Sequence, residues 1–170
     1  MGESKRFHEE KENVSEEIFY HEVLLKWEEI FMDILEMIKY AEDIPEFYYD
    51  LCWLFVEFQE KNPVCFSSVL TILLAEEETR KKQPLLEEIY QVGERINELI
   101  VIYLTRGVAE GVFRIGINTT ETVLFLWASI TGILKFVENK EENLVARVGM
   151  ERKEFLDYSF GLLFQSIRVA

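Results

Sequence analysis

The stretch RGVAEGVFRIGINTTETVLFLWASITGIL, residues 106–134, indicates the architecture of this chain more clearly than any other. Glycine disfavours a helix interior by about 1 kcal/mol but suits a helix end with positive φ, so Gly107 and Gly111 predict the end of one helix. Asn118, followed three residues later by Glu121, matches a capping box and predicts the start of another. The stretch therefore predicts a long helix, a short polar turn and a strongly apolar second helix.

Apolar residues repeat at spacings of three and four along most of the remaining chain, which is typical of amphipathic helices. Asn62-Pro63 is a helix-start signal, an asparagine cap followed by proline at the first helical position. Residues 139–149 read as a polar link. The predicted helices cover approximately residues 16–40, 47–60, 63–75, 85–110, 119–138 and 151–169. We expect an all-α bundle of about six helices over residues 16–170, preceded by a polar, mobile segment at residues 1–15.

Length, composition and net charge favour a soluble globular domain and oppose nucleic-acid binding. The chain has 170 residues, of which 49% are hydrophobic, enough to form one domain with a buried core. Its 32 acidic and 18 basic residues leave a net charge of −14, which opposes binding to a phosphate backbone. Cys52 and Cys65 lie in apolar segments and are expected as buried free thiols. No signal core opens the chain, and the apolar run at residues 123–137 is shorter than the ~20 residues that span a bilayer, so we expect a cytoplasmic protein without membrane contact.

Catalytic signals are weak. Only His8 and His21 could act as imidazole bases, and neither is preceded at three positions by the glutamate that a di-metal carboxylate bundle requires. The sequence has no G-x-S-x-G elbow, no Cys-x-x-Cys pair and no glycine-rich phosphate loop. We therefore expect no enzymatic activity, no metal and no cofactor.

Large rings crowd one part of the chain: Phe47, Tyr48, Tyr49, Trp53, Phe55, Phe58 and Phe66. Most of them suit core packing, but rings that leave a gap between helices also form apolar cavities for small ligands. The predicted ligand-binding residues are Phe31, Leu35, Tyr49, Trp53, Phe66, Leu70, Tyr90, Asn97 and Trp127. Mostly apolar walls favour a lipophilic ligand, and the many rings with the negative charge tilt the expectation slightly towards a cation.

The last two predicted helices carry more apolar surface than one partner face covers, which is typical of a subunit interface. Small residues at Ala128 and Gly132 would allow two backbones to approach closely. The sequence thus predicts a homodimer formed through residues 119–138 and 151–169. The predicted interface residues are Leu124, Ala128, Thr131, Gly132, Phe155, Phe160, Leu163 and Ile167.

Three motifs in this order resemble the C-terminal effector-binding and dimerisation domain of TetR-type transcriptional repressors. They are the F-x-x-x-x-P junction at residues 58–63, the helix end G-V-A-E-G-V-F-R at 107–114, and L-W-A-x-x-x-G at 126–132. The resemblance covers residues 16–170 and implies an all-helical fold whose last two helices form a four-helix bundle with a second copy. That family binds DNA through an N-terminal helix-turn-helix module, which this chain lacks.

Two functions compete on this basis. The first is the small-molecule-sensing and dimerisation domain of a TetR-like regulator, whose partners would be a second copy, a small lipophilic effector and, through a module not in this chain, DNA. The second is a stand-alone helical dimeric interaction protein without a ligand.

Overall fold

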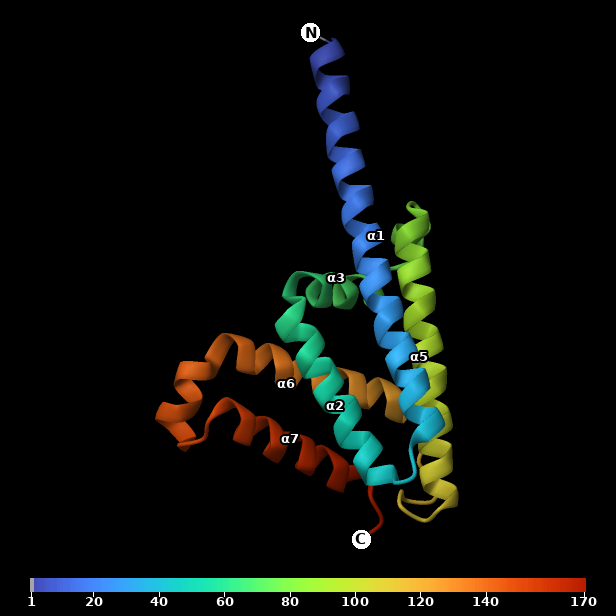
Figure 1. Ribbon diagram of the computed structural model, residues 1–170, viewed down its shortest axis with the longest axis vertical. Coiled ribbons are helices and arrows are strands. Elements are labelled where there is room, and N and C mark those ends of the chain that lie inside the picture. The colour runs from blue at the N-terminus through green and yellow to red at the C-terminus, as the bar shows by residue number, and fades with distance from the viewer. Residues whose placement is uncertain (1) are drawn as a thin grey trace. The chain divides into compact units, whose positions relative to one another are not determined.

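The structure of the chain is a computed structural model that describes residues 2–170, with the side chains of residues 15–138, 144 and 146–170 (Figure 1). No strand occurs among residues 2–170, apart from one isolated bridge between Phe113 and Arg168. The all-α prediction is therefore confirmed for the described part of the chain. The helices are α1 (Gly2–Tyr40), α2 (Ile44–Lys61), α3 (Pro63–Leu73), α4 (Glu77–Arg80), α5 (Pro84–Ala109), α6 (Thr119–Val148) and α7 (Arg152–Ile167).

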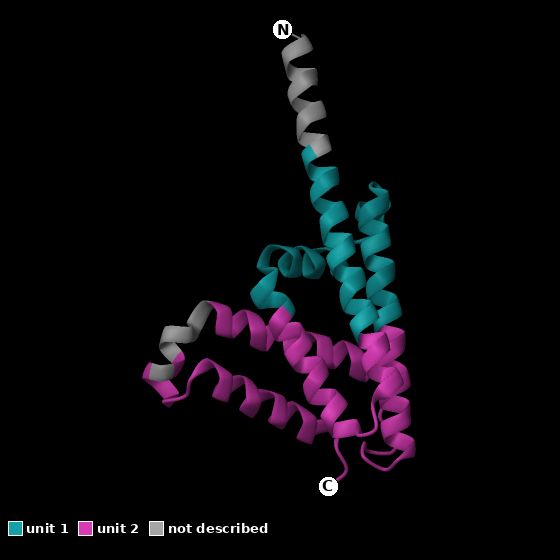
Figure 2. Ribbon diagram, viewed as in Figure 1, with its two compact units in different colours: residues 1–33, 58–96 teal, residues 34–57, 97–170 magenta. Residues whose placement is uncertain are grey.

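The chain forms two compact units, coloured separately in Figure 2. The first unit comprises Met1–Asp33 and Phe58–Ile96, and the second comprises Ile34–Glu57 and Asn97–Ala170. The boundaries fall inside α1, α2 and α5, so each of these helices contributes to both units.

Aromatic packing and close helix approach hold the first unit together. The Trp27 ring of α1 stacks on Phe58 of α2 with centroids 5.9 Å apart, and Phe58 meets the edge of Phe66 of α3 at 6.0 Å. Gly93 of α5 has no side chain, and the space that a Cβ would need is taken by Leu73 of α3. A larger residue at position 93 would therefore displace the end of the Leu73 side chain.

The second unit is built around α6 and α7, which run side by side in opposite directions (Figure 1). Gly149, at φ +65°, turns the chain between them, and a reciprocal capping box of Glu151 and Glu154 starts α7. The hydroxyl of Tyr48 on α2 donates to the carbonyl oxygen of Phe160 at 3.0 Å, which ties α2 to α7.

Two backbone hydrogen bonds, which we call the clasp, join the end of α7 to the turn after α5. The Arg114 N–H donates to the Ile167 carbonyl oxygen at 3.1 Å, and the Val169 N–H donates to the Val112 carbonyl oxygen at 2.9 Å. Between these two bonds, the Phe113 ring is fully buried where a Cβ at Gly107 would otherwise lie. Packing therefore requires glycine at position 107, since only a residue without a side chain leaves room for the Phe113 ring.

Several predicted helix ends are confirmed. Gly111 has φ +75° two residues after the end of α5, and α6 begins at Thr119 with the Asn118 Oδ1 accepting the Glu121 N–H at 3.2 Å. The α2 helix is capped in the same way, because Asp43 Oδ1 accepts the Glu46 N–H at 2.8 Å.

Other expectations about the helix boundaries require correction. The predicted polar link at residues 139–149 is wrong, because α6 continues to Val148 through a stretch without glycine or proline, and only the positive φ of Gly149 ends it. α3 does begin at Pro63, but the Asn62 side chain makes no capping hydrogen bond. α1 begins at Gly2 rather than near residue 16. The segment expected to be mobile, residues 1–15, lies outside the described side chains except for Ser15.

The first twenty residues of α6, Thr119–Glu138, are long and apolar enough to cross a membrane by length and composition. Only 28% of this stretch is buried. The stretch extends beyond the apolar run at residues 123–137 on which the expectation of no membrane contact rests, and its exposed side chains require an explanation.

Candidate functional site

An aromatic cluster fills the interior of the second unit. The rings of Phe55 on α2 and Trp127 on α6 lie 4.8 Å apart, and the Trp127 indole N–H donates to the Asn97 side-chain oxygen of α5 at 2.7 Å. Both buried tyrosine hydroxyls bond to backbone, Tyr48 to the Phe160 carbonyl and Tyr103 to that of Ile44 at 2.8 Å. Their hydrogen bonds leave these rings presenting mainly apolar surface to the interior.

Burial changes the acidity of three groups in this cluster. It raises the pKa of the Tyr48 and Tyr103 hydroxyls well above their usual value. It also raises the pKa of the Cys52 thiol to about 12, which keeps the thiol protonated and unreactive near neutral pH. Cys52 and Cys65 are both buried free cysteines, as predicted.

The free space inside this cluster is small. It measures about 10 Å³, whereas one water needs roughly 10–15 Å³ of such space and small-molecule sites roughly 300 Å³ or more. The space enclosed by these rings is therefore too small for a small-molecule ligand. Its walls are Tyr48, Leu51, Phe55, Ile100, Tyr103, Leu126, Trp127 and Ile130.

The predicted ligand-binding residues divide between the two units. Of those in the second unit, Asn97 and Trp127 meet directly, whereas Tyr49 and Trp53 pack on the α7 rings of Phe164 and Phe160 with centroids 5.8 Å and 6.1 Å apart. The fifth residue of this unit, Leu35, is exposed.

The first unit holds the other four. The Phe31 ring lies beneath the Arg95 guanidinium at 4.6 Å, and the Tyr90 ring lies beneath that of Arg80 at 3.6 Å. Each ring is thus already engaged by a cation of the chain. Phe66 is buried in the core of this unit, and Leu70 is half-buried.

A hollow of about 420 Å³ lies on the first unit between α1 and α5. The side chains of Leu24 and Val92 form its apolar base. The ion pair between Glu28 and Arg95, 4.0 Å apart, spans the same two helices. The hollow is also lined by Glu87 and Glu88, so its acidic side chains outnumber its one basic side chain, Arg95.

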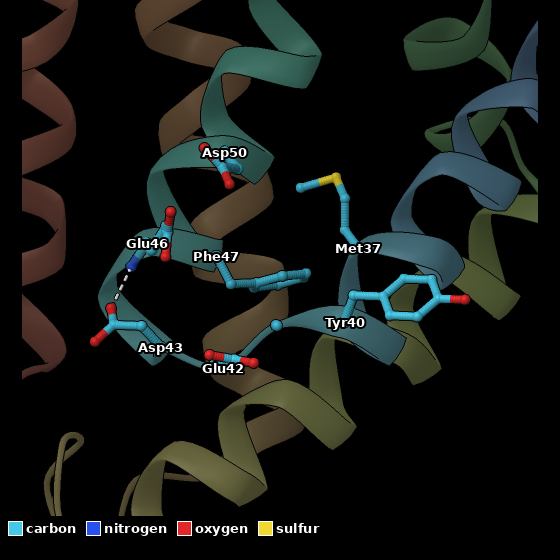
Figure 3. A pocket seen from close by; sticks show the side chains of 8 residues that line it. Met37, Tyr40, Glu42, Asp43, Glu46, Phe47 and Asp50 are labelled. Atoms are coloured by element: carbon cyan, nitrogen blue, oxygen red, sulfur yellow. Dashed lines mark hydrogen bonds between the residues drawn. The ribbon is translucent and has the colours of Figure 1, made fainter.

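A second hollow, of about 320 Å³, lies where α1 ends and α2 begins, within the second unit (Figure 3). We call it the corner hollow. The Phe47 ring points from α2 towards α1, where the Met37 and Tyr40 side chains begin (Figure 3). Its lining residues are Met37, Tyr40, Ala41, Glu42, Asp43, Glu46, Phe47 and Asp50.

None of the eight residues that line the corner hollow was among the predicted ligand-binding residues. A signal for them existed in the sequence, since Glu46 and Asp50 are four residues apart and therefore share one face of α2. They follow directly on the helix break that Asp43 and Pro45 mark.

Exposed apolar side chains lie along α6 and α7. On α6 they share one face at spacings of four, with Leu124 60% exposed and Phe136 49% exposed. A Cβ placed on Gly132 in the same face meets no described atom within 4 Å. We call this set the apolar surface of α6 and α7, and it comprises Leu124, Phe125, Ala128, Gly132, Phe136, Tyr158 and Leu162.

The predicted interface residues fall into three groups. Leu124, Ala128 and Gly132 are exposed, and Thr131 and Phe155 are half-buried. The remaining three point into the interior of their own chain, where a partner would not reach them: Phe160, Leu163 and Ile167. On α7 the exposed apolar residues are instead Tyr158 and Leu162, because apolar residues cover more than one face of this helix.

Comparisons of this chain with protein-family models, with curated proteins and with solved structures found no match.

Proposed function

We propose that this chain is the small-molecule-sensing and dimerisation domain of a TetR-like, cytoplasmic transcriptional regulator. The apolar surface of α6 and α7 carries this proposal, because large exposed apolar patches mark interaction sites. The order of motifs supports it as well, since the motif at residues 107–114 spans the end of α5 and the L-W-A-x-x-x-G sequence at 126–132 lies within α6.

A second copy of the chain is the occupant that fits this surface best. A two-fold dimer places the same patch of both chains face to face, so the patch must be able to pack against itself. The open space around Gly132, with Ala128 one turn before it, leaves room for another helix to approach closely. We expect the dimer to bury on the order of 2,000 Å² in total, as stable homodimers do.

Sedimentation of the full chain tests this dimer. Wild-type protein should sediment as a dimer at micromolar concentration, and Gly132→Phe should sediment as a monomer because the added ring occupies the space of the partner helix. The substitution fits the single chain, since no described atom lies within 4 Å of the new Cβ. Thr105→Phe, at an exposed position of α5, is the matched control and should leave the dimer intact.

Lipid is the competing occupant, because Thr119–Glu138 could cross a membrane by length and composition. A dimeric protein should remain in solution when mixed with phospholipid vesicles, whereas a lipid-binding α6 should carry it into the floating fraction. Wild-type protein that is monomeric and floats with vesicles would exclude the proposed dimer.

The interior supports a second candidate, a helical dimeric interaction protein without a ligand. Pockets for small molecules are usually largely pre-formed, and the space enclosed by the aromatic cluster measures only about 10 Å³. Saturable thermal stabilisation by a lipophilic compound would favour the sensing function. Dimerisation without stabilisation by neutral, cationic or anionic amphiphiles would favour the interaction protein.

A further inference from the structure

We propose that the corner hollow binds a small lipophilic organic cation, such as a quaternary ammonium with one aromatic group. The proposal rests on the proposed function only in assigning this ligand as the effector. The volume of about 320 Å³ lies at the lower end of the range for small-molecule sites.

Contacts from α5 fix the backbone and one ring of the hollow. Arg106 of α5 donates from its guanidinium to the Ala41 carbonyl oxygen at 2.7 Å and to that of Glu42 at 3.3 Å, which fixes the end of α1. The Tyr103 ring supports Phe47 at a centroid distance of 4.4 Å. A ligand would therefore meet a pre-formed site and would not have to order the turn, which removes part of the free-energy cost of binding.

The wall of the hollow matches an amphiphilic ligand. Met37, Ala41 and the edge of the mostly buried Phe47 supply an apolar wall, and a polarisable thioether adapts to irregular apolar groups. Met37 comes from α1 and Phe47 from α2 (Figure 3), so an apolar group placed between them would be enclosed on two sides.

The charge around this wall selects the sign of the ligand. The carboxylates of Glu42, Glu46 and Asp50 form no ion pair with any described residue. The fourth acid, Asp43, caps α2 instead. A cationic head beside the three unpaired carboxylates would gain Coulomb energy, whereas an anion would be repelled.

Two cations that contact residues of the hollow, Arg106 and Lys39, do not themselves line it. Arg106 is engaged by two backbone carbonyls and by the Glu110 carboxylate at 2.6 Å, and Lys39 lies over the Tyr40 ring at 5.1 Å. Neither residue belongs to the lining. The negative charge of the three carboxylates is therefore not cancelled within the hollow itself.

Titration of the full chain with benzyltrimethylammonium tests the proposal, with benzyl alcohol as the neutral analogue and benzoate as the anionic one. We expect saturable binding of the cation at millimolar or lower concentration by calorimetry, with affinity at least about tenfold above that of the alcohol, and no binding of benzoate. Glu46→Gln and Asp50→Asn should each weaken cation binding about threefold to tenfold.

Glu98→Gln, at an exposed position of α5 outside the lining, is the control that removes the same charge elsewhere. It should leave the affinity unchanged. Circular dichroism and the melting temperature of each variant check that it is folded, and the Met37→Glu variant, which places a charge in the apolar wall, provides a second substitution in the hollow.

Three results would overturn the proposal: no saturable binding of the cation, equal binding of the neutral alcohol, or equal weakening by Glu98→Gln. Sedimentation of the same samples separates these failures from a failure of the proposed function. A dimer that binds a different lipophilic compound would keep the sensing function and exclude only the corner hollow.

Discussion

The indole N–H of Trp127 donates to the side-chain oxygen of Asn97 at 2.7 Å, and this bond links α6 to α5 at the half-buried margin of the aromatic cluster. Replacing Asn97 by alanine removes the acceptor, and replacing Trp127 by phenylalanine removes the donor. A double-mutant cycle in urea unfolding should give a coupling free energy of about 0.5–1.5 kcal/mol, the range for a hydrogen bond between neutral groups. Strictly additive effects would show that the bond contributes nothing to stability. Glu98→Ala, at the next position of α5, is the control and should not couple to Trp127.

Two glycines of the second unit should respond oppositely to alanine. Gly107→Ala would place a Cβ on the Phe113 ring, so we expect a loss of about 1–3 kcal/mol in the free energy of unfolding, as in overpacked cores. Gly161→Ala brings its Cβ only to ordinary contact with the Tyr49 hydroxyl at 3.8 Å, and it should gain about 0.5–1 kcal/mol because alanine favours a helix. Denaturant midpoints measure both changes. Combining Gly107→Ala with Phe113→Leu should restore part of the loss, and failure to do so would disprove the steric explanation.

Arg80 should be more important for the stability of the first unit than an ordinary surface cation. Its guanidinium is mostly buried over the Tyr90 ring at 3.6 Å, donates to the Ala75 carbonyl oxygen and lies 3.4 Å from the Glu87 carboxylate. Arg80→Lys keeps the charge but loses the flat stacking surface and the donor fork, so we expect a loss of about 1–2 kcal/mol. Hydrogen exchange should accelerate in residues 75–84. Lys82→Ala, an exposed neighbour, should not change the exchange of this segment.

Stability should fall in alkaline solution. A thiol whose pKa is raised in the folded state contributes stability that is complete below its unfolded pKa, near 9, and is lost as the pH rises towards the folded value of about 12. The raised pKa values of Tyr48 and Tyr103 act in the same direction above pH 10. Each group adds up to about 1.4 kcal/mol per pH unit to the slope in its range. The free energy of unfolding, measured in urea from pH 8 to pH 11, should fall less steeply in Cys52→Ala. An identical slope in this variant would contradict the assignment to Cys52.

Helix ends were predictable where a residue constrains its own backbone. Pro63 and Pro84 open α3 and α5, and Gly111 and Asn118 mark the turn before α6, because proline, a left-handed glycine and an N-cap asparagine each act locally. The end of α6 was not predictable from polarity. Residues 139–148 are mostly polar, like a link, yet lysine, glutamate and arginine are also good helix formers, so the helix continues until Gly149.

Neither the orientation of α7 nor the corner hollow could be predicted from the sequence, for a different reason. The apolar residues of α7 occur on more than one face, so its pattern alone does not decide that Phe160 is buried and Leu162 exposed. That choice depends on packing with other helices, such as the contact of Phe160 with Trp53. The corner hollow likewise depends on a contact between distant residues, because the Arg106 guanidinium donates to the carbonyl oxygen of Ala41, 65 positions earlier in the chain.

The clasp between the end of α7 and the turn at residues 112–114 also determines how late in synthesis this part of the fold can form. Every segment of the first unit has been made once the ribosome has passed Ile96, whereas Val112 obtains its partner only when Val169 has left the exit tunnel. Domains tend to fold as units while the chain emerges, and contacts between distant residues form slowly. Until then the Phe113 ring lacks its contact with Phe164, so the packing around the turn at residues 112–114 is completed after all segments of the first unit have been made.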